Sequence, residues 1–293
     1  MSHDAESRAI LQDACTTVGL TGDHAVARRL AENEHWWIPP DLIARIGQPS
    51  QIDAEARAVL IARWLTTQGI LTVVPLDATQ PVVVNRRPVT FWHEVPVHEH
   101  GTVEDLAGVL RKLHAIAQPA FMLPQLDPLV RVRARLEAAT TLPPQDAVWL
   151  LDLHDDLENQ WADGVTSRYP ACIVHGDAWP GNIVRTPQGP LVMDLERVAI
   201  GPREWDLVST AVRTFTTGAV EIRDYQQFSQ SYGYDVTAWD GYPLLSTTRE
   251  LRITAYAAQH AATNPRWRNE AQLRVDCLRG RRGPRPWLWT GIM

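Results

Sequence analysis

The chain has 293 residues, of which 45% are hydrophobic and 21% charged, and its net charge is −6. These values are typical of a globular protein with one large domain or two lobes, and the acidic balance argues against nonspecific nucleic-acid binding. No apolar run is long enough for a membrane span, and the first residues lack the features of a signal peptide, so we expect no membrane partner. Cys15, Cys172 and Cys277 are far apart and odd in number, which favours a cytoplasmic location over a disulfide framework or metal knuckle.

The first hundred residues alternate short strands with helices. Hydrophobic periodicity and turn residues predict helices over 4–18 and 51–68 and strands over 25–30, 35–38, 42–46, 82–84 and 89–92. This order is typical of a small sheet lobe that carries one helix. We expect a hinge over 92–96, which would divide the chain into an N-terminal nucleotide-binding lobe, residues 1–95, and a C-terminal catalytic and substrate-binding lobe, residues 96–293.

From about residue 102 the pattern becomes helical. Helices are predicted over 102–117, 128–140, 143–165, 203–215, 220–231, 243–262 and 266–279. We expect Asp127 to cap the second of these, with Pro128 in its first turn. The predicted fold class is therefore α+β, with a small β-sheet lobe and a larger, mainly helical lobe.

One segment carries a pattern of catalytic residues. Residues 175–182 read H-G-D-x-x-x-x-N, and Asp194 follows after two short predicted strands joined by a turn over 186–189. The hairpin returns Asp194 to the side of Asn182, and the two oxygen ligands suit Mg²⁺. Asp177 stays at the loop tip, where it can accept a proton from a bound alcohol. This is the spacing of a phosphoryl-transfer catalytic loop.

The segment resembles the aminoglycoside phosphotransferase family, small-molecule kinases distantly similar to protein kinases. A G-P-x-x-x-D-L helix start, which usually follows in that family, is present over 201–207. The resemblance implies a two-lobed protein-kinase-like fold over nearly the whole chain. By position it implies these roles: Asp177 as catalytic base, Asn182 and Asp194 as Mg²⁺ ligands, Asp206 as the buried brace of the catalytic loop, and His175 as a loop-packing residue.

The resemblance also implies ATP or GTP as the phosphoryl donor. Lys112 is the only lysine, so a G-x-x-x-x-G-K-[ST] phosphate loop is excluded. Kinases of this broad type place a basic residue on the third strand and pair it with a helix Glu, and Arg45 and Glu55 are the candidates here. We expect a base-binding hinge at Glu94 and Val95, which would use backbone groups.

The sequence does not name the acceptor. Related folds phosphorylate aminoglycosides, other antibiotics, choline, amino alcohols and sugars, so antibiotic resistance is one implied role. Trp179, Asp240 and Glu250 are candidates to hold a hydroxylated, donor-rich acceptor. Asp240 could instead cap the following helix, and Glu250 could instead form a surface ion pair. Glu196 follows Asp194 by two residues, which in a strand would put both side chains on one face, so Glu196 could assist the metal through water; a solvated acid is the alternative.

The protein is expected to be a monomer or a homodimer. Two function classes other than a kinase also remain open. A catalytically inactive kinase-fold regulator that binds a nucleotide or metabolite is favoured by the turn over 31–35, which would cover the nucleotide but contains no glycine. A metal-dependent hydrolase would use His175, Asp177 and Asp194. Nucleotide turnover with Mg²⁺ separates the kinase from both.

Overall fold

The computed structural model describes residues 3–30, 33–95 and 98–291, and its internal contacts divide the chain into two compact units. The sheet unit comprises Met1–Gly101 and Gly181–Val198, and the helical unit comprises Thr102–Pro180 and Ala199–Met293. The sheet unit therefore includes the hairpin that follows the catalytic loop, a segment that the predicted lobe of residues 1–95 lacks. The expected α+β fold class is confirmed.

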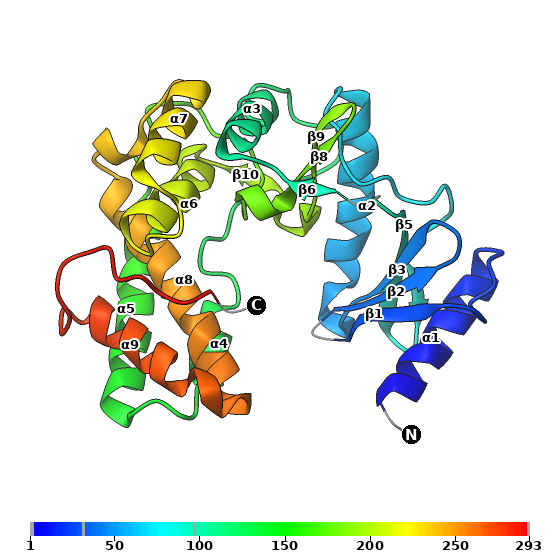
Figure 1. The fold of residues 1–293 in the computed structure, drawn as a ribbon, viewed down its shortest axis with the longest axis horizontal. Coiled ribbons are helices and arrows are strands. Elements are labelled where there is room, and N and C mark those ends of the chain that lie inside the picture. Colours follow the sequence, from blue (N-terminus) through cyan, green and yellow to red (C-terminus); the bar gives the residue numbers. More distant parts are fainter. Residues whose placement is uncertain (1–2, 31–32, 96–97, 292–293) are drawn as a thin grey trace. The chain divides into compact units, whose positions relative to one another are not determined.

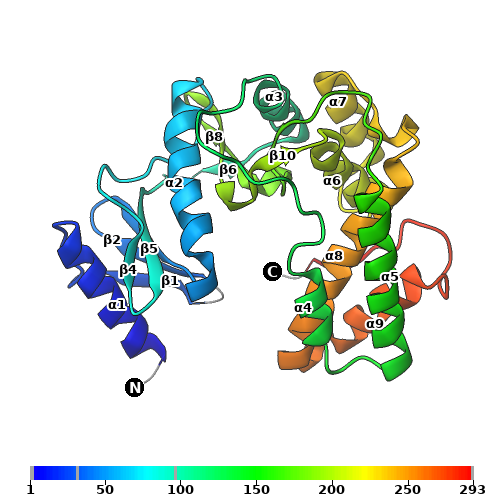
Figure 2. The same cartoon turned by 180° about the vertical axis from the view of Figure 1, so that it is seen from behind.

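The main sheet of the sheet unit is antiparallel throughout. Its strands, in spatial order, are β1 (Val26–Leu30), β2 (Glu34–Ile38), β3 (Leu42–Ile46), β5 (Arg87–His93) and β4 (Val82–Val84). Helix α1 (His3–Thr17) covers one face and helix α2 (Ile52–Thr67) covers the other, as Figures 1 and 2 show from opposite sides. The predicted strands and helices of this region are all present.

The period of two along each strand decides what each face of this sheet carries. Ala44 and Ile46 of β3 are buried in the core that also contains Ile10 of α1 and Phe91 of β5. Arg45 lies between them in sequence, so its side chain points to the opposite face, which α2 covers. The alternation therefore brings the only basic residue of β3 toward α2.

A second, three-stranded sheet contains the expected hairpin. Strand β8 (Ile183–Thr186) pairs with β9 (Gly189–Val192), and β6 (Glu99–His100) pairs with the other edge of β8. The Met193 amide donates to the Asn182 carbonyl at 2.9 Å. Asn182 and Asp194 therefore lie at the same open end of the hairpin.

The helical unit is built around α8, which contacts four other helices. Its elements are α3 (Val103–Leu113), α4 (Val132–Glu137), α5 (Pro144–Ala162), β7 (Cys172–Val174), β10 (Ala199–Gly201), α6 (Glu204–Phe215), α7 (Ile222–Tyr232), α8 (Tyr242–Thr263) and α9 (Arg268–Leu278). Apolar residues of α4, α5, α8 and α9 form one core cluster. Strand β10, which pairs antiparallel with β7, was not predicted from the sequence.

The predicted helix over 128–140 is shorter than expected, and the expected cap is wrong. Helix α4 begins at Val132, and the residue before it, Arg131, has the left-handed φ of +64° that interrupts helical backbone. Asp127 instead accepts a hydrogen bond from the Leu129 amide at 2.9 Å, which closes a local turn.

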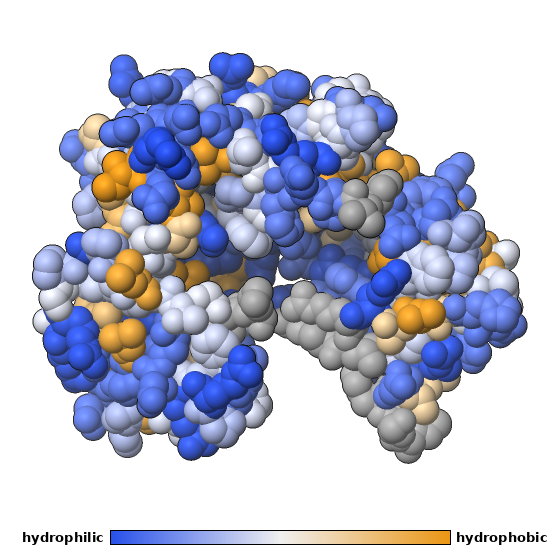
Figure 3. Space-filling view, in the orientation of Figure 1, coloured by the Kyte–Doolittle hydropathy of each residue, from blue (hydrophilic) through white to orange (hydrophobic). Residues whose placement is uncertain are grey.

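The surface in view in Figure 3 is mainly hydrophilic, with hydrophobic side chains in separate spots. Met122 and Leu288 are among the exposed apolar side chains, at 90% and 70% exposure. Isolated apolar residues of this kind are normal on a protein surface. Within the described residues, no helix has the length and apolar character needed to cross a membrane.

Candidate active site

A single buried carboxylate braces the H-G-D loop within the helical unit. Asp206, in the first turn of α6, accepts hydrogen bonds from the amides of His175 at 2.7 Å and Gly176 at 2.9 Å, and from His114 Nε2 at 3.0 Å. Burial by itself raises the pKa of Asp206, but the bonds to His114 and His175 outweigh it and hold that pKa below its ordinary value. Two successive loop amides are therefore fixed to one charged group.

Replacing Asp206 with Asn is expected to lower the free energy of unfolding by about 3 kcal/mol. An amide cannot accept all three hydrogen bonds, and the buried donors would lose the negative charge that they now face. The depressed folded-state pKa means that the stability from Asp206 is present above pH 3.8 and is lost as the pH falls through the folded value. Urea unfolding at several pH values measures this. Exposed Asp163→Asn is the matched control, and equal stability of both variants at pH 7 would contradict the brace.

The other loop side chains fix its shape. His175 is buried, and its Nδ1 accepts a bond from the Asp177 amide at 3.3 Å. The indole Nε1 of Trp205 donates to the Gly176 carbonyl at 2.9 Å, and Gly176 has a φ of +81°, which glycine adopts without strain. The sequence reading of His175 as a packing residue agrees with this placement.

Asp177 is the half-exposed member of the loop, and a buried arginine holds it. Its side chain is 48% exposed, and Oδ1 accepts a bond from Arg249 Nη1 at 3.3 Å. Arg249 Nη2 also donates to the carbonyls of Gly176 at 3.4 Å and Trp205 at 3.2 Å. Burial lowers the pKa of Arg249 while Asp177 opposes the shift. Sequence reasoning missed this role, since no motif links α8 to the loop.

Asp177 and Trp179 line one hollow of about 380 Å³ in the helical unit, called the Asp177 hollow below. It is lined by Asp177, Trp179, Ser209, Val212, Arg213, Thr217, Ala219, Arg249, Ile253, Tyr256, Arg274, Trp289, Thr290 and Gly291. Asp177 is the sole carboxylate of this lining, which also holds three arginines. A small molecule bound there would have its hydroxyl within reach of a proton acceptor.

The structure does not bring Asp240 and Glu250 to this hollow. Asp240 is exposed, lines a different hollow, and does not cap α8, whose N-cap is Gly241. Glu250 is only 1% exposed and pairs with Arg285, with Nη2 and Oε2 2.8 Å apart. Successive helix residues point about 100° apart, so Glu250 faces away when Arg249 faces the loop. The alternative reading of Glu250 as part of a surface ion pair holds only for its partner, because Glu250 is buried whereas Arg285 is 47% exposed.

Arg45 and Glu55 form the expected pair inside the sheet unit. Arg45 Nε lies 3.3 Å from Glu55 Oε1, and Arg45 Nη2 lies 2.5 Å from Glu196 Oε2. Burial raises the pKa of Glu55 against the lowering effect of Arg45. For Arg45, burial lowers the pKa, but Glu55, Glu196 and Asp194 outweigh it and raise the pKa overall. Arg45 is thus a permanent cation among three carboxylates.

The donor groups around Arg45 fit a divalent metal. Asp194 lies in a left-handed conformation (φ 57°, ψ 57°) directly before a 3-10 turn, Leu195–Arg197, so the expectation that Asp194 and Glu196 share a strand face is wrong. Glu55 Oε1 is buried and forms no hydrogen bond, because its ion pair with Arg45 Nε at 3.3 Å lacks hydrogen-bond geometry. The carboxylates of Glu55, Glu196 and Asp194 still outnumber the guanidinium groups, although Arg197 Nε also lies 4.0 Å from Glu196 Oε1, and oxygen ligands with excess negative charge suit Mg²⁺. Asn182 and Asp194 are the residues that would hold the ion.

A second hollow, of about 400 Å³, lies within the sheet unit. It is lined by His35, Ile43, Arg45, Ala58, Val73, Trp92, His93, Glu94, Val95, Met193, Asp194 and Leu195. The His93 amide donates a hydrogen bond to the Val74 carbonyl at 2.8 Å, and the Glu94 amide donates to the Asp41 carbonyl at 2.7 Å. Among the described residues the Val95 amide has no hydrogen-bond partner. Of the expected covering turn over 31–35, residues 31–32 lie outside the described residues.

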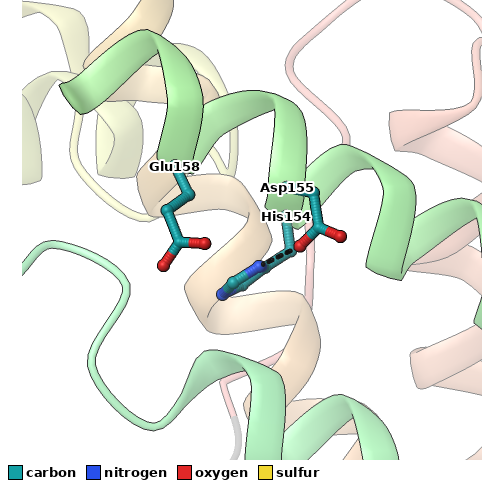
Figure 4. Close-up of side chains that lie close together, drawn as sticks. All are labelled: His154, Asp155 and Glu158. Atoms are coloured by element: carbon teal, nitrogen blue, oxygen red, sulfur yellow. Dashed lines mark hydrogen bonds and ion pairs between the residues drawn. The ribbon is translucent and has the colours of Figure 1, made fainter. Parts of the chain in front are cut away.

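A third group of polar side chains lies on α5, away from these residues in sequence. His154, Asp155 and Glu158 are the one set in the described part of the chain whose His, Cys, Asp or Glu ligand atoms lie close enough to share an ion (Figure 4). Arg133 already pairs with Asp155, and His154 Nδ1 bonds the same carboxylate at 2.9 Å. The guanidinium neutralises the acid, so this cluster is a structural ion pair rather than a metal centre.

A small antiparallel sheet with an Arg–Glu pair and a helical unit with a braced H-G-D loop are features of a protein-kinase-like fold. The chain belongs to the phosphotransferase enzyme family, whose sequence model matches residues 23–245. The resemblance to aminoglycoside phosphotransferases is confirmed. A comparison with curated proteins finds no match.

Solved structures with the same fold cover nearly the whole chain. Amicoumacin kinase hAmiN, bound to AMP-PNP, Ca²⁺ and Ami, has a TM-score of 0.66 at 14% identity and covers 93% of this chain and 96% of its own. A microcompartment-associated aminopropanol kinase has a TM-score of 0.64 at 20% identity, with coverage of 94% and 99%. A choline/ethanolamine kinase family protein from Mesorhizobium loti has a TM-score of 0.60 at 18% identity, with coverage of 94% of each chain. At these identities the likeness shows the fold.

Proposed function

We propose that this protein is a small-molecule kinase that transfers the γ-phosphate of ATP or GTP to a hydroxyl group of a small acceptor. The observation that carries the proposal is the position of Asp177, a half-exposed carboxylate on a loop that Asp206 braces, in the lining of a hollow of about 380 Å³. Free Cys15, Cys172 and Cys277, all buried, support a reducing compartment such as the cytoplasm.

Each proposed role follows from a named side chain. Asp177 accepts the proton of the acceptor hydroxyl, whose oxygen forms a bond to the γ-phosphorus while the bond from that phosphorus to the β-phosphate oxygen breaks. Arg249 and Asp206 keep Asp177 in place. Mg²⁺, held by Asn182 and Asp194, would neutralise the phosphate charges.

The nucleotide base is proposed to lie in the sheet-unit hollow. Ile43, Val73 and Trp92 offer apolar surface for a flat aromatic ring, and the Val95 amide offers a donor to its edge. Arg45 would then bind the phosphates through its planar guanidinium, with Glu55 fixing its orientation.

The two alternatives have less support. A hydrolase would use His175 as a metal ligand, but its buried ring is bonded to the loop through Nδ1. An inactive regulator needs no carboxylate at Asp177, no brace at Asp206 and no buried arginine aimed at Asp177, and the structure has all three.

The function is tested by a transfer screen. The protein is incubated with Mg²⁺ and γ-labelled ATP or GTP and a panel of hydroxylated metabolites and antibiotics, and transfer of label to the acceptor is measured. Acceptor-dependent transfer that is lost in Asp177→Asn supports the kinase. Nucleotide binding without transfer to any acceptor would support the regulator, and nucleotide-independent hydrolysis would support the hydrolase.

Replacing Arg45 with Met is expected to raise the nucleotide KM about 10-fold or more and to leave the acceptor KM nearly unchanged, because a charge-assisted bond to phosphate is lost. Arg45→Lys should recover part of the loss, since a lysine keeps the charge without the fork. The double variant Arg45→Met/Glu55→Gln removes the unpaired buried carboxylate and separates this effect from unfolding. Steady-state kinetics measure the nucleotide KM and the acceptor KM of each variant. Arg57→Met, on the same helix as Glu55, is the control. An unchanged nucleotide KM in all Arg45 variants would show that Arg45 does not bind the phosphates.

A further inference from the structure

Arg213 is the arginine of the Asp177 hollow whose side-chain donors form no hydrogen bond with any residue that the structure describes. It lies on α6, seven residues after Asp206, so both side chains are on the same side of the helix. Its guanidinium carbon lies 4.8 Å from the centroid of the Trp179 ring. Among the described residues it donates no hydrogen bond and forms no ion pair, and its Nε is buried without a partner.

The other two arginines of the hollow donate hydrogen bonds within the fold, although Arg249 Nε, like Arg213 Nε, is buried without a partner. Arg249 donates to Asp177 and to two loop carbonyls. Arg274 donates from Nε to Glu270 at 2.8 Å, from Nη1 to the Ile253 carbonyl at 2.9 Å and from Nη2 to the Thr290 carbonyl at 2.5 Å. These contacts explain both residues as structural cations. Nothing in the described residues explains Arg213 in the same way.

The burial of Arg213 carries a cost that a ligand would offset. Burial lowers the pKa of Arg213, and Asp177 opposes the shift without pairing with it. A guanidinium that is partly desolvated and stacked on an indole has its planar donors held in one orientation. Such a group binds carboxylate or phosphate oxygens well and repels ammonium groups.

We propose that the acceptor of this kinase carries an anionic group, a carboxylate or a phosphate, which Arg213 binds beside Trp179 while Asp177 accepts the hydroxyl proton. The inference rests on the proposed function, because it assigns the acceptor to the Asp177 hollow. It reverses the expectation from the sequence, in which acidic side chains hold a donor-rich acceptor. The lining contains three arginines and one carboxylate, and that carboxylate has the catalytic role.

The test uses matched probes that differ in charge and shares no step with catalysis. Calorimetry without nucleotide compares glycerate with glycerol, and glucuronate and glucose 6-phosphate with glucose and glucosamine. In the native protein at least one acid should bind about 10- to 100-fold more tightly than its neutral partner, and glucosamine should bind no better than glucose. Arg213→Met should remove the difference and Arg213→Lys should keep part of it. Exposed Arg223→Met, on α7, is the matched control and should behave as native.

Kinetics then locate the anion that Arg213 binds. With an acidic acceptor and saturating nucleotide, Arg213→Met should raise the acceptor KM and leave kcat nearly unchanged. An equal loss of kcat for acidic and neutral acceptors would instead show that Arg213 binds the transferred phosphoryl group, and it would overturn the proposal. The proposal also fails if no acid binds more tightly than its neutral partner. Arg213-dependent binding of an acid without phosphoryl transfer to any acceptor would count against the kinase function, while the anion site would stand.

Discussion

Replacing Asp177 with Asn is expected to lower kcat by about 10²–10⁴-fold, the usual contribution of a positioned general base. The amide keeps the size of the side chain and one oxygen, so Arg249 Nη1 can still donate to it. What is lost is the group that accepts the acceptor proton. Because the side chain is half-exposed, the free energy of unfolding should fall by about 1 kcal/mol or less.

The measurement is phosphoryl transfer to an acceptor found in the screen, together with nucleotide binding by calorimetry. Nucleotide affinity should be nearly intact, since Asp177 belongs to the helical unit and the proposed phosphate ligands belong to the sheet unit. Asp163→Asn, an exposed change in the helical unit, should keep full activity and so controls for nonspecific loss. A variant Asp177→Asn that transfers phosphate at the native rate would show that Asp177 is not the base.

Replacing Asp194 with Asn is expected to remove most of the Mg²⁺ dependence of nucleotide binding and to slow transfer about 100-fold or more, because the ion loses a charged ligand. Asn is the informative substitution because it tolerates the left-handed backbone found at this position, whereas Ala would add strain. Asn182→Ala should cost less, about 10-fold, since it removes an oxygen but no charge.

Calorimetry with AMP-PNP in Mg²⁺ and then in EDTA measures the effect. The native protein should bind more tightly with Mg²⁺, and Asp194→Asn should bind about equally in the two conditions. Asp77→Asn, an exposed change in the sheet unit, should keep the native difference. If Asp194→Asn retains the full Mg²⁺ effect, or if Asn182→Ala costs more, the proposed ligand set is wrong.

The chain's own pattern was sufficient for those parts of the site that lie close together in sequence. The H-G-D loop leads directly into a hairpin, and backbone pairing along β8 and β9 necessarily returns Asp194 to the end that holds Asn182. Arg45 and Glu55 were candidates because Arg45 is the only basic residue of its strand, and the alternation along β3 explains why Arg45 faces α2, where Glu55 meets it. In both cases the regular geometry of a β-strand allows the position of a side chain to be predicted from its residue number.

Only the tertiary structure decided the contacts between distant elements. Arg249 meets Asp177 across 72 residues, and the choice between Arg249 and its neighbour Glu250 depends on how α8 is rotated against the loop, which helical propensity leaves open. The same packing buried Glu250 against Arg285 and placed Arg213 beside Trp179, without an ion-pair partner among the described residues. The H-G-D motif and the family could therefore be recognised from the sequence. The charge of the Asp177 hollow could not be predicted from the sequence, because Arg213, Arg249 and Arg274 come together there only through tertiary packing.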